Sequence, residues 1–89
     1  MEQVRHNTEL DRFELSLHGE TAVLEYRETP QTIAFLHTIV PEKIERQGIG
    51  SLLAKAGLDY AREKQLRVRP DCTFVAAYIE RHPEYQDLL

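Results

Sequence analysis

The sequence predicts a mixed α+β fold, in which a twisted, mostly antiparallel sheet contains one parallel pair of strands and packs against helices. Three observations lead to this fold class. The first part of the chain alternates apolar and polar residues, as strands with one wet face do. An amphipathic helix pattern then follows a long apolar strand, and a short strand follows that helix. Because a helical crossover joins parallel strands, the last two strands should run parallel.

Length and composition indicate one domain, residues 1–89, with a modest core. The chain is 42% hydrophobic and 29% charged, with a formal net charge of −4 and no block of basic residues, which argues against a nucleic-acid partner. No apolar run has the length of a signal peptide or a membrane span. A single cysteine is typical of a reducing compartment, so we expect a cytoplasmic protein without a membrane partner.

The first half of the chain reads as four strands. A short one is expected at residues 4–7, before a turn at 8–11. The next two strands have inward-facing residues at alternate positions, namely Phe13, Leu15 and Leu17, then Ala22, Leu24 and Tyr26. Residues 18–20 form the hairpin turn between them. The fourth strand, 32–40, is apolar on both faces, so we expect it to be central and covered on both sides.

The second half reads as a helix, a strand and a helix. The long helix has one apolar stripe, formed by Ile49, Leu52, Leu53, Ala56 and Tyr60. Gly57 lies inside this helix, where it indicates close packing against the sheet. A strand at 66–69 should run parallel to the fourth strand after a right-handed crossover. Thr73 is then expected to cap a helix over 74–81, which Pro83 ends.

Two glycines, Gly48 and Gly50, stand between the fourth strand and the long helix. Backbone N–H groups at such a helix N-terminus form a site for phosphate. Two common phosphate loops are excluded, because no lysine follows Gly50 and because Leu53 stands where the dinucleotide fingerprint requires a third glycine. On the glycines alone, a tight loop before a helix is the alternative interpretation.

The residues around this loop resemble a known family. Val40-Pro41-Glu42, followed by Gly48-x-Gly50 and an amphipathic helix, is similar to the acetyl-CoA-binding motif of the GNAT (Gcn5-related N-acetyltransferase) superfamily. Two later segments resemble the signature of its minimal, single-domain branch: Pro70-x-Cys72-x-Phe74-Val75-x-x-Tyr78-Ile79 and His82-Pro83-Glu84-Tyr85. The resemblance runs over residues 10–89. It departs at Glu45, where the superfamily has Arg or Gln, although Arg46 could supply the missing positive charge.

The resemblance implies a GNAT-like fold and acetyl-CoA as cofactor. The pyrophosphate would lie on main-chain N–H groups of the loop, and the pantetheine arm would pair with the edge of the fourth strand, which splaying from the fifth exposes. The cofactor-binding residues are then expected to be Ile39, Val40, Arg46, Gln47, Gly48, Ile49, Gly50 and Ser51.

Three residues are candidates for catalysis. Cys72 precedes a helix whose N-terminus lowers a thiol pKa, although an unpaired cysteine is also a common core residue. His37 is placed on the strand face of Phe35 and Ile39, where a buried imidazole needs a partner. Cys72 could be that partner and would then be an activated nucleophile, and a backbone carbonyl is the alternative. The resemblance implies that this cysteine and histidine work together.

Tyr78 is the third candidate, because the resemblance implies a tyrosine that protonates the departing CoA thiolate. Its spacing with Val75 and Ile79 fits an ordinary core position equally well. His6 and His18 are expected to be solvated. No histidine, cysteine or carboxylate pair has the spacing of metal ligands, so no metal is expected.

The leading hypothesis is an acetyl-CoA-dependent N-acetyltransferase, in which an amine attacks directly or through an acetyl-Cys72 intermediate. The acceptor would be a small molecule or a protein amine, and the acidic net charge suits amines or basic peptides. A non-catalytic acyl-CoA-binding or regulatory module is the alternative, and a purely structural interaction domain is a third. A monomer or weak dimer is expected.

Overall fold

A single five-stranded sheet forms the centre of the protein. The computed structural model describes residues 3–89 and gives the strand order β1-β2-β3-β4-β5. The strands are β1 (Arg5–Asn7), β2 (Arg12–Leu17), β3 (Glu20–Glu28), β4 (Thr32–Ile39) and β5 (Arg67–Pro70). The first four pair antiparallel, whereas β4 and β5 pair parallel. The mixed α+β fold class with one parallel pair is therefore confirmed.

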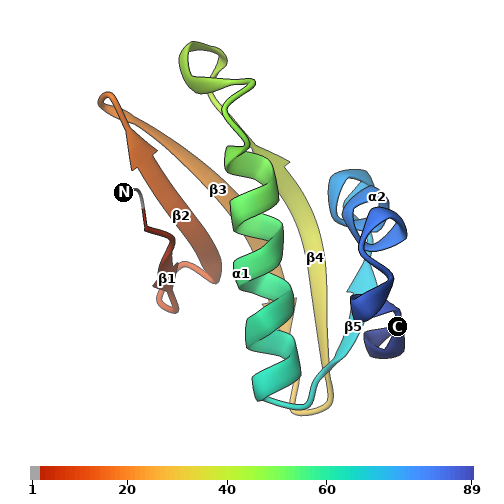
Figure 1. The fold of residues 1–89 in the computed structure, drawn as a ribbon. Helices are drawn as coiled ribbons and strands as arrows, with labels where there is room; N and C mark the ends of the chain where they lie inside the picture. Colours follow the sequence, from red (N-terminus) through yellow and green to blue (C-terminus); the bar gives the residue numbers. More distant parts are fainter. Residues whose placement is uncertain (1–2) are drawn as a thin grey trace.

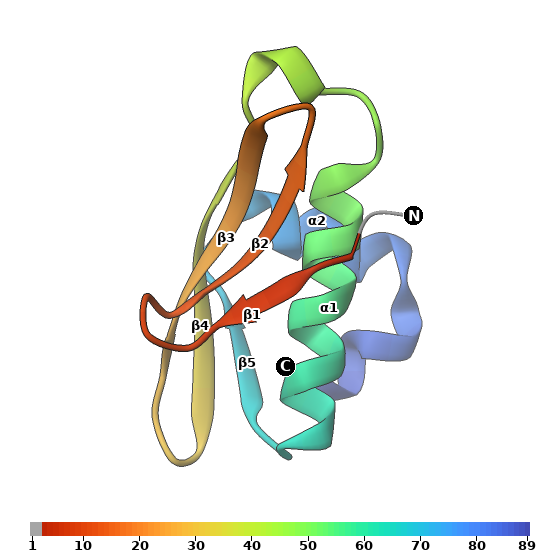
Figure 2. The ribbon, with the colours of Figure 1, turned by 90° about the vertical axis from the view of Figure 1, so that its left-hand side faces the viewer.

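Both α-helices cover the same face of this sheet. The helix α1 (Ile49–Glu63) connects β4 to β5, and α2 (Thr73–Arg81) follows β5 (Figure 1). Turned by 90°, the molecule presents the sheet edge-on with both helices on one side (Figure 2). Two 3₁₀ helices, η1 (Glu42–Ile44) and η2 (Pro83–Leu88), are too short for a periodic pattern and were not predicted. None of the helices in residues 3–89 has the length and apolar composition needed to span a bilayer.

The prediction that β4 is covered on both sides is wrong, and so is the predicted face of His37. In the pairing with β3, Phe35 lies opposite Tyr26 while His37 lies opposite Glu25, so Leu36 is an inserted residue. Such a bulge exchanges the faces of the residues that follow it. Phe35, before the bulge, is buried under the helices. His37, after the bulge, is exposed and lies on the open face.

The helix α1 packs closely on β4 through Gly57, as the sequence predicted. A Cβ atom at this position would lie 2.7 Å from Cε1 of Phe35 and 3.2 Å from Cδ2 of Leu24. The buried stripe is rotated from the predicted one, because this contact turns Leu53 and Leu58 toward the sheet and leaves Leu52 44% exposed.

His6 is half-buried and not the freely solvated residue that the sequence predicted, because it joins an aromatic cluster. Its ring stacks on Phe13 with 4.2 Å between centroids, and Tyr60 of α1 meets its edge at 4.5 Å. Its Nε2 shares a hydrogen bond of 2.6 Å with the hydroxyl of Tyr26, whose pKa burial raises to about 12. The cluster thus ties the short strand β1 to β3 and α1.

Replacement of Gly57 by alanine should destabilise the protein. Overpacking against Phe35 costs about 1–3 kcal/mol, which should exceed the gain of about 1 kcal/mol from higher helix propensity. Urea unfolding of Gly57→Ala measures this loss. In a Phe35→Leu background the same substitution should cost less, because the ring atoms that crowd the new methyl group are gone. An equal cost in both backgrounds would show that this contact is not the constraint.

Stability should also fall as His6 becomes protonated. Burial lowers the pKa of His6 below its ordinary value of 6.5, Lys64 adds to this, and Glu28 and Asp11 oppose it. The unfolded chain therefore binds the proton more readily, and stability is lost as the pH falls from 6.5 through the lower folded-state pKa. Between about pH 8 and about pH 5.5, wild type should lose more unfolding free energy than His6→Gln. His18→Asn, which changes an exposed histidine, should behave like wild type; a loss as large in His6→Gln would contradict the assignment.

Candidate functional site

The strands β4 and β5 separate near the middle of β4. Their pairing runs from Thr32 opposite Arg67 to Phe35 opposite Pro70. One further bond follows, in which the backbone N–H of Cys72 donates to the carbonyl of Phe35 at 2.8 Å. The strand β4 then continues to Ile39, while the chain beyond Cys72 turns into α2. The β5-facing edge of β4 therefore has no strand partner after Phe35, which is the splaying that the sequence predicted.

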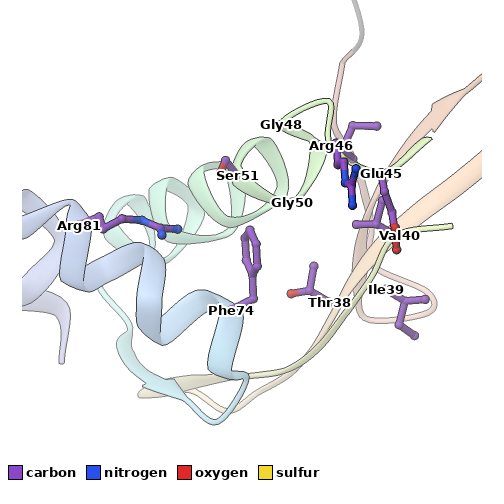
Figure 3. A pocket seen from close by; sticks show the side chains of 11 residues that line it. Thr38, Ile39, Val40, Glu45, Arg46, Gly48, Gly50, Ser51, Phe74 and Arg81 are labelled. Atoms are coloured by element: carbon purple, nitrogen blue, oxygen red, sulfur yellow. The ribbon is translucent and has the colours of Figure 1, made fainter. Parts of the chain in front are cut away.

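A cavity of about 580 Å³ opens beside this splayed edge, and we call it the glycine cavity (Figure 3). Its size lies within the usual range for small-molecule sites. It is lined by the end of β4, the loop, the first turn of α1 and two residues of α2, namely Thr38, Ile39, Val40, Glu45, Arg46, Gly48, Ile49, Gly50, Ser51, Phe74 and Arg81. All of the predicted cofactor-binding residues except Gln47 thus lie around one cavity.

The N-terminus of α1 points its free backbone groups at this cavity. Gly48 is the N-cap residue, with a left-handed φ of 75° that suits glycine, and no side chain caps the helix. The first helical bond runs from the N–H of Leu52 to the carbonyl of Gly48 at 3.1 Å. The N–H groups of Ile49, Gly50 and Ser51 therefore lack a partner within the helix, as at every helix start, and the helix dipole favours an anion there.

Two arginines from different elements add positive charge. Arg46 belongs to the loop and Arg81 to the last turn of α2, and both are exposed. Neither makes a hydrogen bond or an ion pair to another residue of the described chain. Glu45 also lines the cavity and offsets part of this charge. Sequence reasoning missed Arg81, because only the packing of α2 beside α1 brings it to the cavity.

Phe74 was also missed, although it divides the site. A Cβ atom on Gly50 would lie 2.7 Å from Cζ of Phe74, so the absence of a side chain at position 50 lets this ring stand against α1. In Figure 3 the ring projects from α2 between Gly50 and Thr38. It lines the glycine cavity on one side and a second cavity on the other.

The second cavity, of about 420 Å³, contains the predicted pair Cys72 and His37, and we call it the cysteine cavity. Its other lining residues are Leu36, Thr38, Ile39, Asp71, Thr73 and Phe74. The hydrogen-bond partner of the buried thiol is Thr38, whose Oγ1 lies 3.2 Å from Sγ, and not His37. Cys72 itself, with extended backbone, is the N-cap of α2, so the predicted cap at Thr73 is off by one residue.

Tyr78 does not join these residues, since it lines neither cavity. Its ring is buried, stacks on His82 at 3.9 Å between centroids and lies 6.1 Å from the ring of Tyr85. Burial raises the pKa of its hydroxyl, while Lys55 of α1 acts in the opposite direction. This position matches the core interpretation. Among residues 3–89, no three histidine, cysteine or carboxylate side chains gather as a metal site.

Comparisons with known proteins show the family of the chain. The sequence profile of the family described as GCN5-related N-acetyl-transferase matches residues 12–88. Protein NATD1 of Gallus gallus is 34% identical over 84 residues, which cover 91% of this chain and 76% of the relative. Protein NATD1 of Homo sapiens is 33% identical, with 91% and 74% covered. Protein NATD1 of Danio rerio is 31% identical over 88 residues, with 93% and 80% covered.

Proposed function

Because the chain belongs to the family of GCN5-related N-acetyltransferases, we propose that it binds acetyl-CoA in the glycine cavity and acetylates an amine in the cysteine cavity. The observation that carries this proposal is the shared wall of the two cavities, which Thr38, Ile39 and Phe74 all line. A donor and an acceptor that bind on either side of this wall would meet in a fixed orientation, which lowers the entropic part of the barrier.

The residues of the glycine cavity fit a phosphorylated ligand. The pyrophosphate would accept hydrogen bonds from the N–H groups of Ile49, Gly50 and Ser51, and Arg46 and Arg81 would neutralise its charge. The amide groups of the pantetheine arm would pair with the free edge of β4 near Ile39 and Val40, as an added strand does. These contacts would direct the thioester toward Thr38 and the second cavity.

Acetyl-CoA, when bound, supplies an acetyl thioester. In the direct route, the amine nitrogen would bond to the acetyl carbon, CoA would leave as its thiolate, and the exposed imidazole of His37 would accept the proton of the amine. In the covalent route, the Sγ of Cys72 would accept the acetyl group first, with its proton passing to His37 and CoA leaving as the thiolate. The amine would then take the acetyl group from Cys72 and lose its proton to the released cysteine sulfur. Thr38, whose Oγ1 lies 3.2 Å from Sγ, is the side chain next to the reacting sulfur in this route.

A second candidate function is a non-catalytic acyl-CoA-binding module, and the position of Tyr78 favours it. The direct route needs a proton for the departing thiolate, and Tyr78, the predicted donor, packs in the core away from both cavities. A module of this kind would bind the cofactor without turnover.

Binding of acetyl-CoA should depend on Arg81. Isothermal calorimetry is expected to detect binding by wild type, and Arg81→Gln should weaken it about tenfold, since loss of one charge-assisted hydrogen bond costs about 1.5 kcal/mol. Lys64→Gln removes an exposed charge on the far end of α1 and should bind like wild type. No binding by wild type at millimolar acetyl-CoA would refute the proposed cofactor.

Intact-mass spectrometry and turnover then separate the routes. After incubation with acetyl-CoA, one added acetyl group in wild type that is absent in Cys72→Ala would support the covalent route. Turnover without such an adduct, lost in His37→Gln, would support the direct route. Tyr78→Phe should keep full turnover if its ring is only core, and a loss would restore its predicted role as acid. Cofactor binding without transfer to any amine would favour the module.

A further inference from the structure

The face of the sheet turned away from the helices is rich in arginine. In the strand register Arg5 lies opposite Glu14, and Arg12 lies opposite Glu25. At the other end of the sheet, Arg27 and Arg69 lie opposite Ala34 from its two sides. Residues directly opposite share a face, and this is the face without helices in Figure 2. We call this open face of the sheet, which carries Arg5, Arg12, Arg27, Ala34 and Arg69, the arginine face.

The guanidinium groups of Arg27 and Arg69, which flank Ala34, are available to a partner. Arg27 is exposed and makes no hydrogen bond or ion pair to any residue from 3 to 89. The side chain of Arg69 is 67% exposed, and its one ion pair, to Asp71, is long at 3.5 Å. Such exposed pairs contribute little and exchange easily. Ala34 between them is small and leaves space for a ligand, whereas Arg12 is held by Glu14 at 2.6 Å.

This charge runs against that of the whole chain. The formal net charge is −4, but on the arginine face the carboxylates are Glu14, already bonded to Arg12 and Asn7, Glu25, and Asp71 at its border, which pairs with Arg69. The acidic side chains are thus concentrated elsewhere. The expectation from net charge, that basic partners would be preferred, therefore does not apply to this face, which complements an acidic partner.

The chemistry of the face favours a polypeptide over a nucleic acid. Among the described residues, the aromatic rings of the strands, Phe13, Tyr26 and Phe35, all face the helices and are buried. Bases of a single strand would find no phenylalanine or tyrosine ring to stack on there, and His37 offers only one imidazole. Guanidinium groups form paired hydrogen bonds with carboxylates, and the exposed Ile39 beside Val23 offers apolar contact at the other end of the face.

The arginine face is continuous with the cysteine cavity. His37 lines that cavity and lies opposite Glu25, and Asp71 lines it and pairs with Arg69. A cationic amine at the cavity would meet these two carboxylates, while acidic residues next to it would reach Arg27 and Arg69. We propose that the arginine face binds an acidic polypeptide segment, whose amine is the acceptor. This inference rests on the proposed function and names its substrate class.

Fluorescence anisotropy with a synthetic peptide tests the docking. The probe is a peptide of alternating Glu and Gly with a free N-terminal amine and a dye at its C-terminus. Wild type should bind it at low salt, and the double variant Arg27→Gln/Arg69→Gln should bind about tenfold more weakly. The control Lys55→Gln/Lys64→Gln, with the same charge change in α1 and its C-cap, should bind like wild type. Thermal melts check that both variants are folded.

Several results would overturn the inference. The peptide could fail to bind, or both double variants could weaken it equally, which would reduce the effect to net charge. A single-stranded oligonucleotide of the same charge could bind as tightly through the same arginines. Light scattering could reveal a dimer that Arg27→Gln/Arg69→Gln dissociates, which would make a second copy the occupant.

Calorimetry with acetyl-CoA on the same samples keeps this inference distinct from the proposed function. Peptide binding that depends on the arginines, together with acetyl-CoA binding and acetylation of the peptide amine, would support both. Acetyl-CoA binding without peptide binding would overturn the docking alone. Peptide binding without acetyl-CoA binding would refute the proposed function and, with it, the assignment of the bound segment as an acceptor.

Discussion

The inserted residue in β4 is the constraint on which the rest of the site depends. If Leu36 were paired in regular register instead of bulged, the alternation of the strand would place His37 under the helices with Phe35 and would turn Thr38 outward. With the bulge, Thr38 faces the thiol of Cys72 while His37 faces the open side. A single bulged residue therefore decides which side chains at the end of β4 face the thiol and which face the open side of the sheet.

The contact between Gly57 and Phe35 fixes the second half of the site. Because this helix position has no side chain, α1 can approach the buried ring, and the rigid helix carries that placement to its N-terminus. Gly50 has the same role toward Phe74 near that end. Two glycines seven residues apart thus allow α1 to pack closely on the sheet and on α2. The glycine cavity is the space that remains between the N-terminus of α1, the end of β4 and α2.

Much of the fold was predictable because it depends on local periodicity. The alternation in β2 and β3, the glycines before α1 and the crossover to a parallel β5 are each encoded in short segments. The site was predictable only in part. The loop residues follow from their motif, whereas the bulge at Leu36, the bond from Thr38 to Cys72 and the approach of Arg81 depend on contacts between distant segments. The error for His37 follows from the bulge alone.

The distribution of charge matters more for this protein than its sum. A net charge of −4 describes the long-range attraction of charged partners, and salt screens this attraction at distances beyond about 10 Å. A bound partner lies closer than that and meets the local side chains. On the open face those are Arg27 and Arg69, and at the cysteine cavity they are Asp71 and His37. With the arginines next to the carboxylate of Asp71, an amine that has acidic neighbours would bind more tightly than an amine alone. Acceptor selection would therefore depend on the surface around the cavity as much as on its interior.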